Sequence, residues 1–119
     1  MVNEYSASDG DLFPYRFKFN KLGTVIGHRT WGGVVGYSGT IPVVDGGSIV
    51  TPSYAPFAAD GSGFIIEGHG VDPDILLEND PYLEFNGEDQ QLKQSHRSDL
   101  EKLKTEKKEV PAIPEFPVK

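Results

Sequence analysis

Cysteine is absent from this 119-residue sequence, and long apolar runs are absent too. Without cysteine, disulfide bonds, thiolate nucleophiles and cysteine-ligated zinc are excluded. No apolar stretch approaches the roughly 18 residues of a membrane-spanning helix, and no signal-peptide pattern opens the chain. The three histidines lie far apart, without the i, i+4 spacing of a helical zinc motif. We therefore expect no metal, no cofactor and no membrane partner.

Basic residues are also few, with 11 lysines and arginines against 18 acidic residues and a net charge of −7. An acidic chain without a basic stripe argues against binding to nucleic acid. The hydrophobic fraction is 37%, and 14 glycines and 9 prolines supply many turns. This composition is typical of a folded, loop-rich α/β or β-rich domain, or of a piece of one.

A small, polar stretch near the start, Asn3 to Asp11, runs directly into an aromatic segment that reads as a helix from Leu12. Unpaired backbone N–H groups gather at such a helix start and can stabilise an anion, so a serine there is well placed as a nucleophile. The alternative is that Ser8, Asp9 or Asp11 only caps the helix, and local chemistry alone favours capping.

The elements around this stretch predict a parallel step. Residues 1–3 read as the tail of a strand whose body lies upstream. If Asp11 caps the helix, Pro14 falls in its first turn, and Gly23 is expected just past its end. The apolar residues 24–27 then read as a strand parallel to the first.

The middle of the chain is expected to fold as short β-hairpins. Strand-like segments flank two turn signals, at residues 45–47 and 60–63, and the last of these strands ends at Glu67. A loop follows, and residues 75–77 read as one more short strand.

The C-terminal third has helical composition. Asp80 and Pro81 predict a helix start, and residues 88–108 form a helical stretch with a thin apolar stripe. The expected domains are a partial catalytic α/β core over residues 1–80, a helical segment over 81–109 and a proline-rich flexible tail over 110–119.

Several ordered blocks carry a family resemblance. They are residues 3–11 (NEYSASDGD), 27–33 (GHRTWGG), 44–47 (VDGG), 67–74 (EGHGVDPD), 79–81 (NDP) and 89–92 (DQQL). Together they resemble the C-terminal catalytic part of tricorn-type proteases, relatives of the tail-specific, C-terminal-processing serine peptidases. No single block is decisive, and the resemblance rests on the ordered set, which covers roughly residues 1–95.

The resemblance implies an α/β fold with a partial crotonase-like core, short β-hairpins and a C-terminal helix. It implies that Ser8 attacks the peptide carbonyl and that the backbone N–H of Asp9 forms half of the oxyanion hole. It also implies that Glu67 completes a relay by bonding a serine that orients the general-base histidine. In the family that histidine, that serine, the other oxyanion glycine and the acidic specificity residue all lie upstream. This chain carries no matched base, and a serine hydroxyl without one is a poor nucleophile.

His69 is the one resident candidate for the missing base. It lies two residues from Glu67 and would share its side of a continuing strand. Ser8, His69 and Glu67 would then form an improvised triad, which requires the base within hydrogen-bond reach. The alternatives are that His69 shapes the active-site loop or faces solvent, and that Glu67 is an edge-strand residue facing water.

Other conspicuous side chains have structural interpretations. Residues 28–33 form a glycine-rich loop. We expect His28 to pack in this loop, Trp31 to pack under it, and His96 to lie on the helix surface. Asp72 and Asp74 are expected to cap their turn rather than to bind calcium, because the loop lacks the oxygen spacing of a calcium hand.

The sequence therefore predicts the C-terminal catalytic portion of a serine-type endopeptidase, inactive by itself because it lacks the base. The expected partners are peptide substrates, the upstream half of the same protease in cis or in trans, and further copies in a homo-oligomer. The resemblance implies a cytoplasmic location. The alternative function is a non-catalytic truncated product or an assembly module derived from such a protease.

Overall fold

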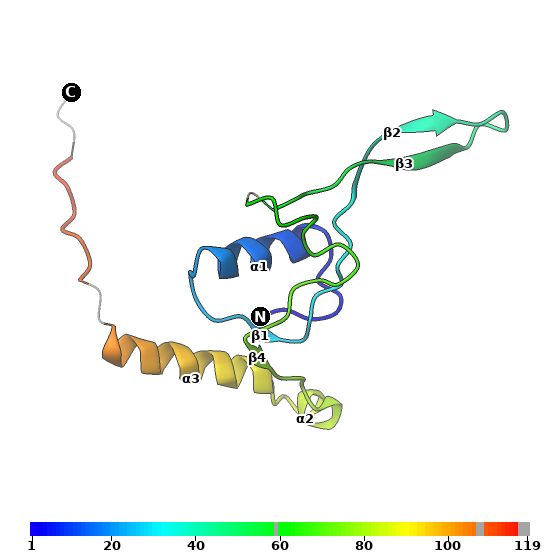
Figure 1. The fold of residues 1–119 in the computed structure, drawn as a ribbon. Coiled ribbons are helices and arrows are strands. Elements are labelled where there is room, and N and C mark those ends of the chain that lie inside the picture. Colours follow the sequence, from blue (N-terminus) through cyan, green and yellow to red (C-terminus); the bar gives the residue numbers. More distant parts are fainter. Residues whose placement is uncertain (59, 107–108, 117–119) are drawn as a thin grey trace.

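The computed structural model describes residues 1–58, 60–106 and 109–116. Helix α1 lies beside a small parallel sheet, a β-hairpin projects from this centre, and two further helices follow (Figure 1). The described part of the chain contains no helix with the length and apolarity needed to cross a membrane.

Helix α1 (Asp9–Phe19) begins earlier than predicted, with Ser8 rather than Asp11 at its N-cap. Asp11 occupies the third helical position, and Pro14 lies inside the helix rather than in its first turn. Ser8 was one of the three residues considered as a cap, but the predicted helix start at Leu12 was wrong. The Asp11 carboxylate binds backbone N–H groups of distant residues, which a local capping argument does not consider.

The end of α1 is a Schellman motif, in which a left-handed residue lets two backbone N–H groups turn back onto the last carbonyls. Lys21 has a φ of 52° and donates its N–H to the carbonyl of Lys18. Leu22 donates its N–H to the carbonyl of Phe17 at 3.1 Å. The left-handed residue is thus Lys21, and the predicted end at Gly23 was wrong.

A small parallel sheet supports the start of α1. Strand β1 (Ile26–Gly27) pairs in parallel with β4 (Ile75–Leu76), and Val2 forms a parallel bridge to the other side of β1. The Val2 N–H donates to the Ile26 carbonyl at 2.9 Å, and the Val2 carbonyl accepts the His28 N–H at 3.0 Å. The parallel step from residues 1–3 through α1 is therefore confirmed, although β1 is shorter than the predicted strand 24–27.

The first predicted hairpin is confirmed. Strands β2 (Gly36–Pro42) and β3 (Ser48–Tyr54) pair antiparallel across the turn at residues 45–47. Nearly all of their residues are exposed, and Asp45 is the one charged residue from position 36 to 54. The hairpin therefore exposes apolar side chains. Because an isolated two-stranded hairpin is only marginally stable in water, contact with further polypeptide would stabilise it.

The second predicted hairpin is reduced to one antiparallel bridge between Phe57 and Phe64. No strand reaches Glu67, so its predicted place on an edge strand was wrong. Ile66 has a φ of 51°, which ends the extended backbone just before Glu67 and turns the chain into a tight loop.

The short helix α2 (Pro81–Phe85) starts as predicted, with Asp80 as its N-cap. The Asp80 carboxylate accepts the backbone N–H groups of Tyr82 and Leu83, and Pro81 takes the first helical position, where no N–H is needed.

Helix α3 (Gln90–Thr105) follows an Asp89 cap and occupies most of the predicted range 88–108, of which residues 107 and 108 lie outside the described part. Residues 109–116 are in neither a helix nor a strand. The rest of the expected tail, residues 117–119, also lies outside the described residues.

The buried apolar core is small for the length of the chain. It consists of Val25, Ile26, Val34, Ala58 and Val71. The accessible surface of 9844 Å² compares with roughly 6,300 Å² for a compact monomer of this mass. Large apolar side chains on α1, the hairpin and α3 remain exposed, so the chain presents surface that suits contact with further polypeptide.

Asp74 fastens β1 to α1 at the entry to β4. Its carboxylate accepts the Val25 N–H at 2.8 Å and meets Lys18 Nζ at 3.0 Å. The Val25 N–H above all, and then Lys18, hold the pKa of Asp74 below its ordinary value of 3.8. The prediction that Asp74 caps its own turn was therefore wrong, because its carboxylate joins two elements instead.

We expect acid to weaken this junction. The folded pKa of Asp74 is depressed, so the ionised carboxylate stabilises the fold above about pH 4 and that contribution is lost as the pH falls through the folded pKa. In urea unfolding, Asp74→Asn should lower the midpoint near neutral pH, and its difference from the parent should shrink at about pH 3. The exposed Glu78→Gln serves as control, and an Asp74→Asn difference that does not change with pH contradicts this account.

Candidate active site

Ser8 stands in an unusual backbone conformation at the start of α1, with φ 56° and ψ −111°. A non-glycine residue at positive φ is strained and persists only where its surroundings hold it. The preceding turn is fastened by the Asn3 side chain, whose Oδ1 accepts from the Tyr5 N–H and the Ser6 hydroxyl. The Ser6 carbonyl in turn accepts the Trp31 N–H at 2.9 Å.

Ser8 is the N-cap of α1 and forms a capping box with Asp11: the Ser8 side chain faces the Asp11 N–H, and the Asp11 carboxylate accepts the Ser8 N–H at 2.9 Å. The hydrogen bond of the Asp11 N–H goes to the Ser8 carbonyl at 2.9 Å, and the Ser8 hydroxyl forms no cap hydrogen bond. Ser8 is exposed. Asp9 follows as the first helical residue, a position whose N–H has no intrahelical acceptor. A hydroxyl and an unpaired N–H therefore lie next to each other at the positive end of the helix.

The Asp11 side chain links the Ser8 turn to the glycine-rich loop. Its side chain is 0% exposed, and its carboxylate accepts three backbone N–H groups: those of Ser8 at 2.9 Å, Gly32 at 2.8 Å and Gly33 at 3.2 Å. Several N–H donors satisfy the hydrogen-bonding capacity of this buried carboxyl group. The start of α1 is thereby fixed to the glycine-rich loop.

Glu67 binds the two residues that directly follow the glycine-rich loop. Its Oε2 accepts the N–H of Val34 at 2.7 Å and of Val35 at 2.9 Å. Asp11 and Glu67 together therefore satisfy four consecutive N–H groups, from Gly32 to Val35. Glu67 itself is exposed.

The glycine-rich loop also stacks on the loop that carries Glu67. Thr30 and Val71 exchange two hydrogen bonds, one through the Thr30 hydroxyl at 2.7 Å and one between backbones at 3.1 Å. The Gly32 carbonyl accepts the Gly68 N–H at 2.7 Å. A Cβ on Gly70 would lie 2.1 Å from the Thr30 carbonyl oxygen, so this contact requires glycine.

His69 does not complete an improvised triad. Its Nε2 lies 2.8 Å from a carboxylate oxygen of Asp72, and its Nδ1 lies 3.3 Å from an Arg29 guanidinium nitrogen. The hydrogen bond from His69 lowers the pKa of Asp72. Glu67, the expected partner of His69, is occupied instead by the two valine N–H groups. The His69 side chain is exposed and contacts its own loop, so the structure agrees with both alternatives, a loop-shaping role and a position facing solvent.

The other histidines lie elsewhere. His28 is half-exposed, with its Nδ1 4.0 Å from the Glu4 carboxylate. His96 lines a hollow of about 640 Å³ along the outer face of α3, away from the Ser8 turn. Within residues 1–58, 60–106 and 109–116, no three acidic or histidine side chains converge as a metal site requires.

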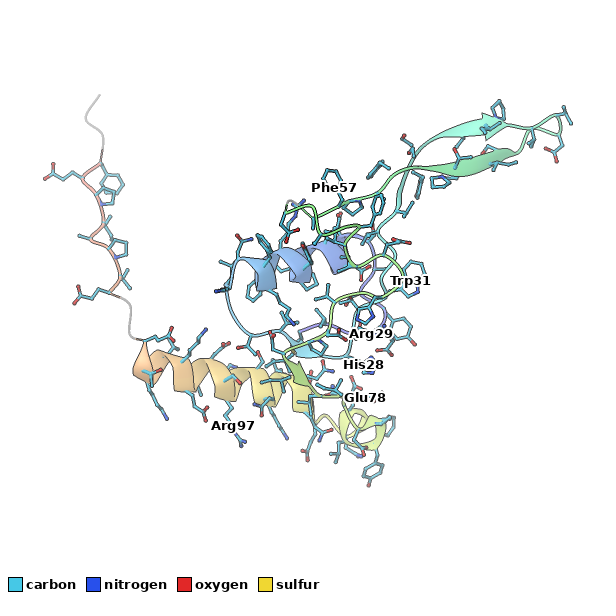
Figure 2. The ribbon with its side chains drawn as sticks, viewed as in Figure 1. His28, Arg29, Trp31, Phe57, Glu78 and Arg97 are labelled. Carbon is cyan, nitrogen blue, oxygen red and sulfur yellow. The ribbon has the colours of Figure 1, made fainter. Side chains whose placement is uncertain are left out.

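Trp31 packs against its own loop at Gly33. Its ring covers Gly33 so closely that a Cβ there would fall 2.2 Å from a ring carbon, yet the side chain is 66% exposed. Trp31, Arg29 and His28 follow one another along one side of the centre (Figure 2). The prediction of a packed tryptophan thus holds for one ring face only.

Asp11 is the residue that the sequence reasoning missed. The pattern Ser8-x-x-Asp11 is a capping-box signature that would have placed the N-cap at Ser8. Nothing in the local pattern indicates the second role of Asp11, because its acceptors serve Gly32 and Gly33, more than twenty positions away.

Comparison with known proteins gives a consistent result. Residues 1–77 match the family model described as peptidase family S41. The chain is 48% identical over 89% of its length to the tricorn protease of Thermoplasma volcanium, and 45% identical over 77% to a putative tricorn-like protease C-terminal subunit of Sulfurisphaera tokodaii. The crystal structure of the tricorn protease matches with a TM-score of 0.77 and 40% identity over 85% of this chain. The chain spans about a tenth of the length of these relatives.

We expect the stacked loops to reject a side chain at Gly70 far more strongly than at Gly68. Both glycines have positive φ, 88° and 74°, but an added Cβ meets the Thr30 backbone at Gly70 and open space at Gly68. Gly68→Ala should therefore cost about 1 kcal/mol, the penalty of the left-handed conformation. Gly70→Ala should cost about 3 kcal/mol or more. Urea unfolding measures both, and equal losses for the two variants contradict the stacking.

Proposed function

Because the chain belongs to peptidase family S41, in its tricorn-type branch, we propose that it carries the nucleophile of a serine-type endopeptidase, Ser8. The observation that carries this proposal is the Ser8 turn: an exposed serine at positive φ at the start of a helix, next to the backbone N–H of Asp9. Such strain clusters at active sites. The match to a known protease family adds to this local argument.

The chemistry follows from the positions of Ser8 and Asp9. The Ser8 Oγ attacks the peptide carbonyl while a histidine base accepts its proton. The carbonyl oxygen becomes an oxyanion, to which the Asp9 N–H donates at the positive end of α1. The histidine then gives its proton to the leaving amine, and water hydrolyses the acyl-Ser8 ester by the same route in reverse.

Glu67 is proposed as the distal acid of the relay. One of its oxygens, Oε2, is taken by the valine N–H groups, and these fix the direction of the carboxylate. The proposed role of Oε1 is to accept a hydrogen bond from the serine that orients the base. Such a group raises the basicity of the histidine and sets its tautomer.

The base and the second oxyanion donor are proposed to come from the upstream part of the protease, in cis or in trans. His69 and His28 have other neighbours, and His96 lies on α3. By itself this chain is therefore inactive, and its small core and large exposed surface suit such a partner.

The finer architecture is part of the same proposal. Residues 1–80 would form part of a crotonase-like catalytic core, residues 81–109 its C-terminal helical segment and residues 110–119 a flexible tail. The assembled protease would be cytoplasmic, would cleave peptides and could form a homo-oligomer through the exposed apolar surfaces. A truncated or purely assembling product is the second candidate, favoured by the absence of a base near Ser8 among the described residues.

We expect a fluorophosphonate probe to leave Ser8 of the isolated chain unlabelled and to label it once the upstream part of the protease is added. Peptide hydrolysis should appear together with labelling, and Ser8→Ala should abolish both, with a loss of about 10⁴-fold or more. Intact-mass measurement and peptide mapping locate the adduct.

His69→Ala is the control for this experiment. It should leave labelling of the assembled enzyme within about threefold of the parent, since the base comes from elsewhere. Labelling of the isolated chain that depends on both Ser8 and His69 refutes the proposed division of the site. Hydrolysis by the assembled enzyme that survives Ser8→Ala refutes Ser8 as the nucleophile.

Glu67→Gln tests the relay. Glutamine keeps one oxygen for the valine N–H groups, but its NH₂ then faces the place where an acceptor is needed. The kcat of the assembled enzyme should fall by about 10²-fold with little change in KM. Glu78→Gln, also exposed, is the matched control. A Glu67→Gln enzyme with the parent kcat excludes the relay role.

A further inference from the structure

We infer that Asp11 is a positioning residue for the reaction: its buried carboxylate sets the backbone conformation that aims the Ser8 hydroxyl and the Asp9 N–H. The inference rests on the proposed function, since it concerns the same nucleophile. It adds a role for a residue that never touches the substrate.

Asp11 is held by backbone donors alone. Its Oδ1 accepts the Gly32 N–H, and its Oδ2 is shared by the N–H groups of Ser8 and Gly33. The side chain is fully buried, and none of the ion pairs among the described residues involves it. A buried carboxylate in this setting binds its donors strongly, because water cannot replace them.

The bond to the Ser8 N–H acts on one particular dihedral. Rotation about the N–Cα bond of Ser8 away from φ 56° would swing either its N–H away from Oδ2 or the start of α1 away from the loop. The carboxylate therefore stabilises the strained conformer against the relaxed ones. Ser8 Oγ, through Cβ, and the Asp9 N–H, through the Ser8 carbonyl carbon, both lie beyond the N–Cα bond, so rotation about this bond redirects both groups.

The same carboxylate places the turn relative to Glu67. The Asp11 carboxylate accepts the N–H groups of Gly32 and Gly33, and the Glu67 carboxylate accepts those of Val34 and Val35. Both acids therefore bind one continuous backbone segment. The nucleophile and the proposed relay acid are thereby fixed to a shared piece of chain. A misplacement of about 1 Å in such a constellation costs on the order of 10²-fold in rate.

The test is Asp11→Asn in the assembled protease. Asparagine keeps the size but offers one oxygen to three N–H groups and turns an NH₂ donor toward them. We expect kcat and the rate of fluorophosphonate labelling of Ser8 each to fall by about 10²-fold, with KM within about threefold of the parent. A role limited to overall stability would lower the folded fraction but would leave both rates unchanged per folded molecule.

The matched control is Asp80→Asn, which removes another carboxylate that caps backbone N–H groups, remote from Ser8. Its kcat should equal that of the parent. If Asp11→Asn folds poorly, it is combined with Gly10→Ala, whose added Cβ lies at an ordinary 3.4 Å from the Ser6 Cβ. Alanine stabilises a helix interior by about 0.5–1 kcal/mol relative to glycine.

Amide hydrogen exchange of the chain gives a readout without catalysis. The Ser8, Gly32 and Gly33 amides should be protected in the parent and should lose protection together in Asp11→Asn. The Val34 and Val35 amides, held by Glu67, should keep more of theirs.

The outcomes separate this inference from the proposed function. If the parent enzyme labels at Ser8 and folded Asp11→Asn labels equally fast, the inference is overturned while Ser8 remains the nucleophile. If the parent enzyme never labels, the proposed function fails, and exchange alone decides whether Asp11 holds the Ser8 turn: unchanged Ser8 protection in Asp11→Asn overturns that as well.

Discussion

The Asp11 carboxylate is the interaction on which the arrangement of the site depends. A carboxyl group buried in so small a domain needs hydrogen-bond donors, and among the described residues those of Asp11 are the backbone N–H groups of Ser8, Gly32 and Gly33. These donors belong to two segments that lie apart in the sequence. Satisfying one carboxylate therefore brings the serine turn and the glycine-rich loop together and sets the entry of α1 between them.

The remaining contacts extend this junction. Glu67 accepts the N–H groups of the two residues that follow the glycine-rich loop. The close contact between Gly70 and Thr30 packs the loop that carries Glu67 against the glycine-rich loop. These contacts place the exposed Ser8 beside two stacked loops. The chain matches about a tenth of the length of its tricorn-type relatives. The exposed hairpin and the leucines of α3 are surfaces that a longer polypeptide would cover.

The sequence predicted those features that local chemistry determines. Asp80 followed by Pro81 defined the start of α2, the glycine turn at residues 45–47 defined the hairpin, and the apolar residues 24–27 defined a parallel neighbour for Val2. These succeed because a cap or a turn satisfies its own neighbours in the chain.

The failures have the opposite cause. Asp11 was considered only as a cap because its distant N–H donors, Gly32 and Gly33, are invisible in the local sequence. Lys21 took the left-handed position that a glycine was expected to fill. The left-handed Ile66 removed the strand that would have placed Glu67 beside His69. The identities of Ser8 and Glu67 as site residues came from the family resemblance and not from local pattern, and their roles remain predictions.

The most direct test of the central claim is a crystal structure of this chain assembled with the upstream part of its protease after reaction with a phosphonate probe. The account predicts a phosphonate bound to Ser8 Oγ, with Ser8 still at positive φ, and a phosphonyl oxygen about 2.7–3.1 Å from the Asp9 nitrogen. The Asp11 carboxylate should still accept the Ser8 N–H. An unmodified Ser8, or a modified one whose backbone has relaxed to negative φ away from Asp11, would contradict the account.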